Sequence, residues 1–279
     1  MRVDAHTHAF AEDQVERRDA IAAADPGFAE LYRDHNAKLA AAGDILAAVE
    51  TAEFDGAVVA GFAFAAEREI EAQNAALAAI TSERRLAPLA TVNPLHDGWE
   101  QTADRALGSW ARGLGELRPW TQGWDPLGPA GHRLCELAAA HNAVLLWHVS
   151  ERIGHDYPGK AGGISAEELW QLARAHPATK MVAAHQGAGL SFFTQMPEVR
   201  ESLLSISFDT AATTLLYAEE SVLRLVDLVG AERVLFGSDY PLLDIGKQYA
   251  HTVGRLDEHA RQAVGGGNAY QLFFERKKA

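Results

Sequence analysis

The chain has 279 residues, 48% of them hydrophobic, and a formal net charge of −13. The negative charge argues against nucleic acid or an anionic membrane as a partner, because both would repel the protein. Its single cysteine, Cys135, excludes an internal disulfide and a cysteine-based zinc site. We find no apolar run of the roughly 20 residues that a membrane helix needs, and no signal-peptide pattern, so we expect a cytoplasmic protein.

Short segments rich in Val, Leu and Phe alternate with longer segments of helical spacing, which is typical of repeated β-α units. We predict strands at residues 2–8, 56–62, 86–92, 113–117, 143–149, 180–185, 204–208 and 233–238. Helices are predicted at residues 44–53, 66–81, 99–107, 130–141, 166–176, 197–202, 219–229 and 268–277. This order predicts an α/β fold, a (β/α)8 TIM barrel that forms one domain over residues 1–279.

A doubly wound open sheet is the alternative, and it is disfavoured because no glycine-rich phosphate turn follows any predicted strand. The glycines at 265–267 follow no strand and are interpreted as a loop. Residues 9–43 are too long for an ordinary connection and have a helical composition, interrupted at Pro26-Gly27. We interpret them as a helical insertion after the first strand, at the active-site end of the barrel, with a role as lid, oligomer contact or packing element.

The first predicted strand contains the segment DAHTH, in which His6 and His8 are two residues apart. Side chains at this spacing leave the same face of a strand, and two imidazoles on one face can hold a metal ion. Histidines near a chain start are more commonly surface residues. Whether His6 and His8 bind a metal therefore depends on which other ligands the sequence provides.

Ionisable residues also stand at the ends of other predicted strands, and in a barrel those ends converge. One such histidine is more commonly a hydrogen-bonded core residue, but a buried group of this kind needs a partner. Four histidines and two acids at one end predict a metal site. The candidates are His6, His8, Glu116, His148, His185 and Asp239.

Several motifs occur in this chain order: DAHTH, Trp147-His148, His185, the segment FGSDYP at 236–241, and Gly267-Asn268-Ala269 followed by Leu272-Phe273. Together they resemble the metal-dependent amidohydrolase superfamily, specifically the amidohydrolase-related branch that includes aminocarboxymuconate-semialdehyde decarboxylase. The likeness runs the length of the chain and implies a (β/α)8 barrel. The β-sandwich that flanks the barrel in other branches is expected to be absent.

This resemblance implies that His6, His8, His148 and Asp239 are metal ligands. It implies that His185 is either a ligand of a second metal or a hydrogen-bond donor to the substrate. Glu116 departs from the mononuclear pattern, because some binuclear superfamily members place a bridging carboxylate there. One or two divalent ions are therefore expected, with zinc as the expected metal; in the alternative, Glu116 pairs with Arg118 or orients a ligand histidine.

For activity, the resemblance implies a metal-dependent hydrolase, in which a divalent ion activates water and polarises a carbonyl. Asp239 would take the proton from that water and His185 would stabilise the oxyanion. We therefore predict cleavage of an amide, ester or lactone. One alternative is non-oxidative decarboxylation of a small carboxylic acid, with His185 and Asp239 handling protons; another is a non-catalytic metal-binding scaffold.

The segment after the fifth strand, residues 150–160, is long and polar. Cations near the metal end of a negatively charged protein suggest a small, carboxylated or phosphorylated substrate, although solvated loop charges are the alternative. We name as candidate substrate-binding residues Arg118, Trp120, Arg152, His155, Tyr157 and Lys160. Phe192, Phe193 and Tyr240 would either form an apolar wall or serve packing, and a homo-oligomer is possible.

Overall fold

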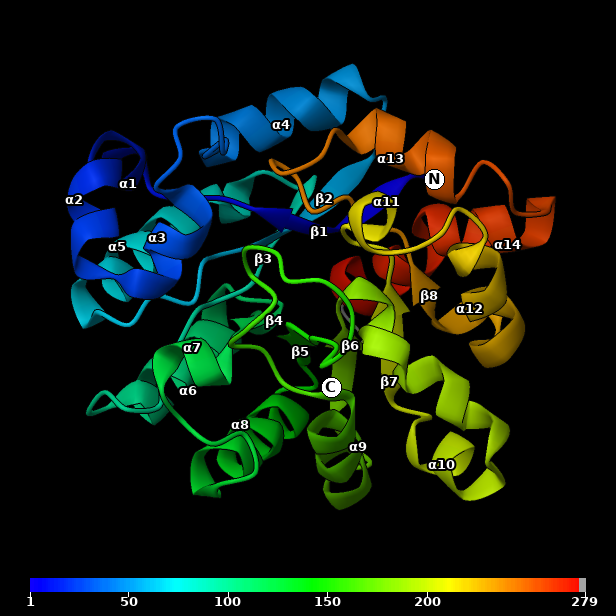
Figure 1. The fold of residues 1–279 in the computed structure, drawn as a ribbon. Helices are drawn as coiled ribbons and strands as arrows, with labels where there is room; N and C mark the ends of the chain where they lie inside the picture. The colour runs from blue at the N-terminus through cyan, green and yellow to red at the C-terminus, as the bar shows by residue number, and fades with distance from the viewer. Residues whose placement is uncertain (276–279) are drawn as a thin grey trace.

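The computed structural model describes residues 1–275, and strands at its centre are surrounded by helices (Figure 1). All strand pairs are parallel. The strands are β1 (Val3–His8), β2 (Gly56–Ala60), β3 (Leu86–Pro88), β4 (Gly113–Leu117), β5 (Val144–Trp147), β6 (Lys180–Ala183), β7 (Ile206–Asp209) and β8 (Val234–Leu235). Each lies within or next to a predicted strand.

The strands close into a ring. β1 to β3 form one sheet in chain order and β4 to β8 form a second. Parallel bridges join the two sheets on both sides, between Ala90 and Leu114 beyond the end of β3, and between Thr7 and Tyr240 beyond the end of β8. The predicted (β/α)8 barrel is therefore confirmed, and the open doubly wound sheet is excluded.

The predicted helices that pack around the barrel form close to their expected positions. They are α4 (Ala42–Thr51), α5 (Glu67–Ala79), α6 (Trp99–Ser109), α8 (Pro129–Ala140), α9 (Ala166–Ala175), α10 (Pro197–Ser202) and α12 (Ser221–Val229). α9 shows why a local signal works: the Ser165 hydroxyl accepts from the backbone N–H of Glu168, whose carboxylate accepts from the backbone N–H of Ser165.

The structure also contains other short helices. They are α7 (Pro119–Gln122), α11 (Thr213–Leu216), α13 (Ile245–Thr252), α14 (Glu258–Gln262), η1 (Ile80–Ser82), η2 (His185–Gln195), η3 (Ala231–Arg233), η4 (Ala263–Gly267) and η5 (Tyr270–Phe274). Of these, η5 lies within the predicted helix 268–277, η1 overlaps the end of the predicted helix 66–81, and the others were not predicted from the sequence. The loop predicted at 265–267 is wrong, because these glycines lie in η4. A Cβ on Gly266 would lie 2.5 Å from the backbone nitrogen of Val3, so the residue allows η4 to pack against β1. The last two residues of the predicted helix 268–277 lie outside the described residues.

The predicted insertion contains α1 (Glu12–Glu16), α2 (Arg18–Ala24) and α3 (Pro26–Tyr32), coloured blue beside α5 in Figure 1. Pro26 begins α3 instead of interrupting a helix, because proline at the first helical position loses no required N–H bond. The carboxylate of Asp25 caps this helix by accepting from the N–H of Phe28 at 3.0 Å. Phe28 packs with Phe10 and Phe64 at ring-centroid distances of 5.9 and 5.6 Å, so the insertion has an aromatic core of its own.

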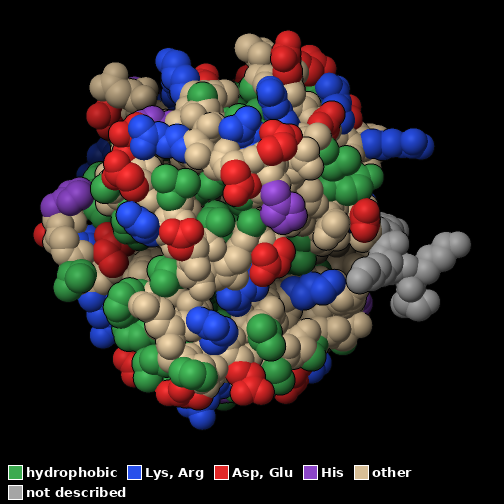
Figure 2. All heavy atoms as spheres, turned by 90° about the vertical axis from the view of Figure 1, so that its right-hand side faces the viewer, with side chains coloured by type: hydrophobic (Ala, Val, Ile, Leu, Met, Phe, Trp, Pro, Cys, Tyr) green, Lys and Arg blue, Asp and Glu red, His purple; other side chains and the backbone are tan. Residues whose placement is uncertain are grey.

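Both faces of the strands are buried, as expected for a parallel barrel covered by helices. In β5, Val144 and Leu146 belong to one hydrophobic cluster, and Leu145 and Trp147 belong to another. Acidic and basic side chains are interspersed over the face shown in Figure 2, with hydrophobic side chains scattered between them. Among residues 1–275, no helix is both long and apolar enough to cross a membrane.

Candidate metal centre

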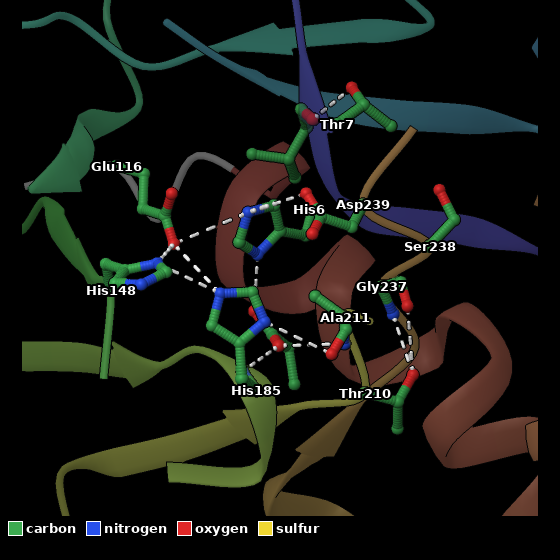
Figure 3. A network of polar contacts seen from close by, with 12 residues as sticks. His6, Thr7, Glu116, His148, His185, Thr210, Ala211, Gly237, Ser238 and Asp239 are labelled. Carbon is green, nitrogen blue, oxygen red and sulfur yellow. Dashed lines mark hydrogen bonds and ion pairs between the residues drawn. The ribbon is translucent and has the colours of Figure 1, made fainter. Parts of the chain in front are cut away.

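The six predicted ligand residues come together at the carboxyl ends of five strands. His6 and His8 lie in β1 and Glu116 in β4, whereas His148, His185 and Asp239 follow β5, β6 and β8. In Figure 3 the Glu116 carboxylate faces the rings of His148 and His185, with His6 and Asp239 beside them. Their roles as ligands stay predictions, but the convergence that those roles require is present.

One group of three donors comes from the two ends of the chain. The Nε2 atoms of His6 and His8 are 3.0 Å apart, and the His8 Nε2 lies 3.3 Å from Oδ1 of Asp239. The donor atoms of these three residues all lie within 4.8 Å of one another. Two imidazole nitrogens and a carboxylate oxygen at this separation fit a divalent ion.

A second group consists of Glu116, His148 and His185. Oε1 of Glu116 lies 2.9 Å from Nδ1 of His148 and 3.4 Å from Nε2 of His185. The resemblance had assigned His148 to the ion held by His6, His8 and Asp239, whereas the structure places it in this second group.

Glu116 also reaches the first group, because its Oε1 lies 3.8 Å from Nε2 of His6. Among the residues described, it forms no ion pair with Arg118, whose Nη2 donates to two loop carbonyls instead. The alternative in which Glu116 only neutralises Arg118 therefore lacks support. Its carboxylate lies between the two groups of donors.

Hydrogen bonds on the far side of three imidazoles set which ring nitrogen faces the site. Carboxylate and carbonyl oxygens only accept, so the nitrogen that contacts them carries the hydrogen and the other nitrogen of a neutral ring keeps its lone pair. These contacts join His6 Nδ1 to Asp209 Oδ2 (2.8 Å), His148 Nε2 to the carbonyl oxygen of Gly159 (2.8 Å) and His185 Nδ1 to that of Ala211 (3.2 Å). The other nitrogen of each ring faces the site, and a bound ion would take the place of the hydrogen that His148 Nδ1 now shares with Glu116.

The charge balance of the site favours a cation. Burial disfavours the charged form of Glu116, but His148 and His6 hold the pKa of this carboxyl well below its usual range. Burial likewise opposes ionisation of Asp239, and a hydrogen bond with His8 together with the charge of His6 lowers its pKa. For His6, burial opposes protonation, yet Asp209 and Glu116 raise its pKa to about 10. The carboxylates attract positive charge, which a divalent ion can supply in place of protons.

Asp209, at the end of β7, is a site residue that the sequence analysis missed. Besides its contact with His6, its Oδ1 accepts from the backbone N–H of His185 at 2.9 Å. His185 has a φ of 55°, which is uncommon and strained for a residue other than glycine, so this bond helps to hold the strained position. A signal existed: the sequence Ser207-Phe208-Asp209 ends a strand in a carboxylate, but the predicted strand stopped one residue early.

Asp4 is a second missed residue. Its Oδ1 accepts from the backbone N–H groups of His6 at 3.1 Å and of Ser238 at 3.0 Å, which links β1 to the segment that carries Asp239. Burial raises the pKa of the Asp4 carboxyl to about 7. Its position in DAHTH, two residues before His6 on the same face, is the signal that would have identified it.

A cavity of about 610 Å³ opens next to the donor groups and is lined by His8, Glu116, His148, His185 and Asp239. Leu31 and Tyr32 of the insertion also line it, which supports the expected location of the insertion. The insertion is tied to the loop after β5, because Glu30 accepts from the N–H of Gly159 at 2.8 Å.

Half of the predicted substrate residues line this cavity, namely Arg118, His155 and Tyr157. Trp120, Arg152 and Lys160 do not appear in the lining within residues 1–275, and neither do Phe192, Phe193 and Tyr240. Lys160 is engaged elsewhere because its Nζ donates to carbonyls of its own loop, including that of His155 at 2.8 Å. Trp120 is 48% exposed, as expected for a side chain turned to solvent.

The fold and the site together define a metal-dependent enzyme built on a (β/α)8 barrel. A family model described as amidohydrolase matches residues 3–274, so the chain belongs to the amidohydrolase family. A search of curated proteins finds no match.

Solved structures with the same fold include three decarboxylases. A 5-carboxyvanillate decarboxylase from Sphingomonas paucimobilis is 17% identical, with a TM-score of 0.78 over 98% of both chains. One from Novosphingobium aromaticivorans, with manganese and 3-methoxy-4-hydroxy-5-nitrobenzoic acid, is 13% identical, with a TM-score of 0.74 over 98% of this chain and 97% of that one. A dihydroxybenzoic acid decarboxylase from Polaromonas, with manganese and 2-nitroresorcinol, is 14% identical, with a TM-score of 0.71 over 98% and 96%.

These structures overturn the prediction that the protein hydrolyses an amide, ester or lactone. That prediction was based on Glu116 and a second ion, but the physical argument was insufficient. An ion held by histidines and carboxylates polarises an oxygen of the substrate whether water then attacks or CO2 then leaves. The ligand set alone therefore does not distinguish the two reactions.

Proposed function

We propose that this protein is a metal-dependent, non-oxidative decarboxylase of a small carboxylic acid. The observation that carries the proposal is the convergence of His6, His8, Asp239 and the Glu116 group beside a cavity of about 610 Å³. Support comes from the similar barrels described above, which are decarboxylases of aromatic acids. A cavity of this volume accommodates a small aromatic acid.

The donor sets would hold two divalent ions, with His6, His8 and Asp239 at one and His148 and His185 at the other. Glu116 would bridge them, because its carboxylate contacts both groups. Imidazole with carboxylate suits zinc, which we expected from the sequence, and two of the similar structures hold manganese. We propose that either ion supports activity.

A bound divalent ion would hold the substrate carboxylate and withdraw electron density from it. In the reaction, the bond between the carboxylate carbon and its neighbour breaks, CO2 leaves, and the neighbouring carbon keeps the electron pair and takes a proton. We assign this proton transfer to Asp239, which lines the cavity and whose side chain is 12% exposed, so it can exchange protons with solvent. His185 completes the second donor group and holds Glu116 in position.

The test is to incubate the manganese- or zinc-loaded protein with hydroxybenzoates and other aromatic carboxylates, and with lactones and amides. We expect CO2 release from at least one acid and, in D2O, one deuterium at the carbon that lost it. Asp239→Asn should abolish turnover while retaining part of the metal, whereas Asp227→Asn, an exposed carboxylate on α12, should leave both unchanged. Acid release without CO2, or no CO2 from any carboxylate, would refute the proposal.

A further inference from the structure

Arg118 is a buried cation whose charge the described protein does not neutralise. It directly follows β4 and is 2% exposed. Its Nη2 donates to the carbonyl oxygens of Gly159 at 3.2 Å and Ala161 at 2.9 Å, which fixes the guanidinium against the loop after β5. Within residues 1–275, its Nε and Nη1 have no hydrogen-bond partner, and no carboxylate forms an ion pair with it.

Such an arrangement is costly unless a ligand completes it. Burying a charge without a partner costs several kcal/mol in general, so buried arginines are normally paired with an anion. The carbonyls of Gly159 and Ala161 accept hydrogen bonds but carry no net charge. The unpaired donors therefore indicate that an anion is bound here during function.

The residue lies at the edge of a cavity in which the proposed metal ions would hold one carboxylate of the substrate. Arg118 lines the same cavity as the donor groups. Phe62, which also lines it, lies under the guanidinium at 6.0 Å from its ring centroid, and with Tyr32 it provides an aromatic wall. A planar guanidinium matches a planar carboxylate in shape and charge.

We propose that Arg118 binds a second carboxylate of the substrate, so that the cavity selects small aromatic acids with two carboxylates. One carboxylate would lie at the ions that the donor groups would hold, and the other at the guanidinium. This inference deepens the proposed function and rests on it, since it concerns the substrate of the same cavity. Arg118 thereby becomes a residue that determines specificity.

The experiment measures equilibrium binding to the metal-loaded protein by calorimetry, with benzene-1,3-dicarboxylate and benzoate as probes. We expect the wild type to bind the dicarboxylate about tenfold more tightly than benzoate, as a charge-assisted hydrogen bond allows. Arg118→Gln, which keeps a donor for the loop carbonyls, should lose that preference while its benzoate affinity stays within about twofold. Arg118→Lys should recover part of the preference, because it restores the charge but not the planar shape.

Arg224→Gln is the control, because this arginine of α12 is exposed and its loss changes the net charge equally. An unchanged preference in Arg118→Gln, or equal binding of both probes by the wild type, would overturn the inference. Benzoate binding by each variant shows that the cavity is intact. If the dicarboxylate binds through Arg118 but no acid loses CO2, the proposed reaction is wrong and the anion site at Arg118 is supported. If CO2 is released from a monocarboxylate alone and Arg118 has no effect, the proposed reaction is supported and the anion site is wrong.

Discussion

Nδ1 of His6 lies 2.8 Å from Oδ2 of Asp209, and both side chains are fully inaccessible to solvent. This contact keeps the hydrogen of His6 on Nδ1 and turns the lone pair of Nε2 toward His8 and Glu116. The carboxylate belongs to β7 and the histidine to β1, so the contact joins strands that are 203 residues apart in sequence.

Asp209→Asn should lower the affinity for the divalent ion by about 10 to 100-fold, the usual effect of removing a hydrogen-bond partner of a ligand histidine. The amide fits the same space but can present its NH2 group to Nδ1 and favour the wrong tautomer. Chelator competition measures the affinity. Asp227→Asn, which is exposed, should bind metal as the wild type does; equal affinities of the two variants would contradict the assigned role.

Glu116→Gln should reduce bound metal from about two ions per chain to about one, because a neutral amide is a poor bridge between two cations. Elemental analysis of the dialysed protein gives this ratio directly. Glu258→Gln changes an exposed glutamate of α14 and should retain both ions. A wild type that never holds more than one ion would show that Glu116 only orients His148.

The metal-free protein should lose stability as the pH rises from about 6.5 to about 10. Asp209 and Glu116 raise the folded-state pKa of His6 to about 10 despite burial, above its ordinary value of 6.5. The stabilisation from protonated His6 is therefore complete below the unfolded pKa and is lost as the pH passes through the folded one. Glu116 raises the pKa of His185 against burial as well, so His185 acts in the same direction.

Urea unfolding of chelator-treated protein at several pH values checks this decline, which should be smaller in His6→Gln. Asp4 adds to this loss of stability at lower pH. Burial raises its folded-state pKa from 3.8 to about 7, so the folded protein becomes less stable as the pH rises between these two values. Metal affinity should change in the opposite direction and increase with pH, because only neutral imidazole binds the ion. A stability of the metal-free protein that increases over this interval would contradict the assignment.

Gly266→Ala should destabilise the protein by about 1–3 kcal/mol, the usual cost of an extra methyl group where no space exists. Its Cβ would lie 2.5 Å from the backbone nitrogen of Val3, so either η4 or β1 must move. Gly43→Ala is the control, because a Cβ there has no atom within 4 Å and the residue lies in α4. That variant should be neutral or slightly stabilising; equal unfolding free energies for the two variants would be inconsistent with the packing described.

The sequence by itself determined the barrel and the set of residues at its carboxyl end. Apolar strand segments followed by His148, His185 or Asp239 are visible in the chain, and parallel strands bring those ends together in any barrel. The length and periodicity of the apolar segments are local properties of the chain, so they can be predicted from the sequence alone. Local hydrogen-bond patterns, such as the capping box at Ser165, likewise fix helix starts without help from the remainder of the chain.

Only the tertiary structure decided how these residues are grouped and which of them face the cavity. The placement of His148 with Glu116, the contact between His6 and Asp209, and the burial of Arg118 depend on strand register and on the path of the loop that contains Gly159. Lys160 is a cation in a polar loop and was therefore predicted to bind the substrate, yet its Nζ donates hydrogen bonds to carbonyl oxygens of its own loop. Contacts between distant segments are set by packing of the whole chain, so residue type and spacing do not determine them.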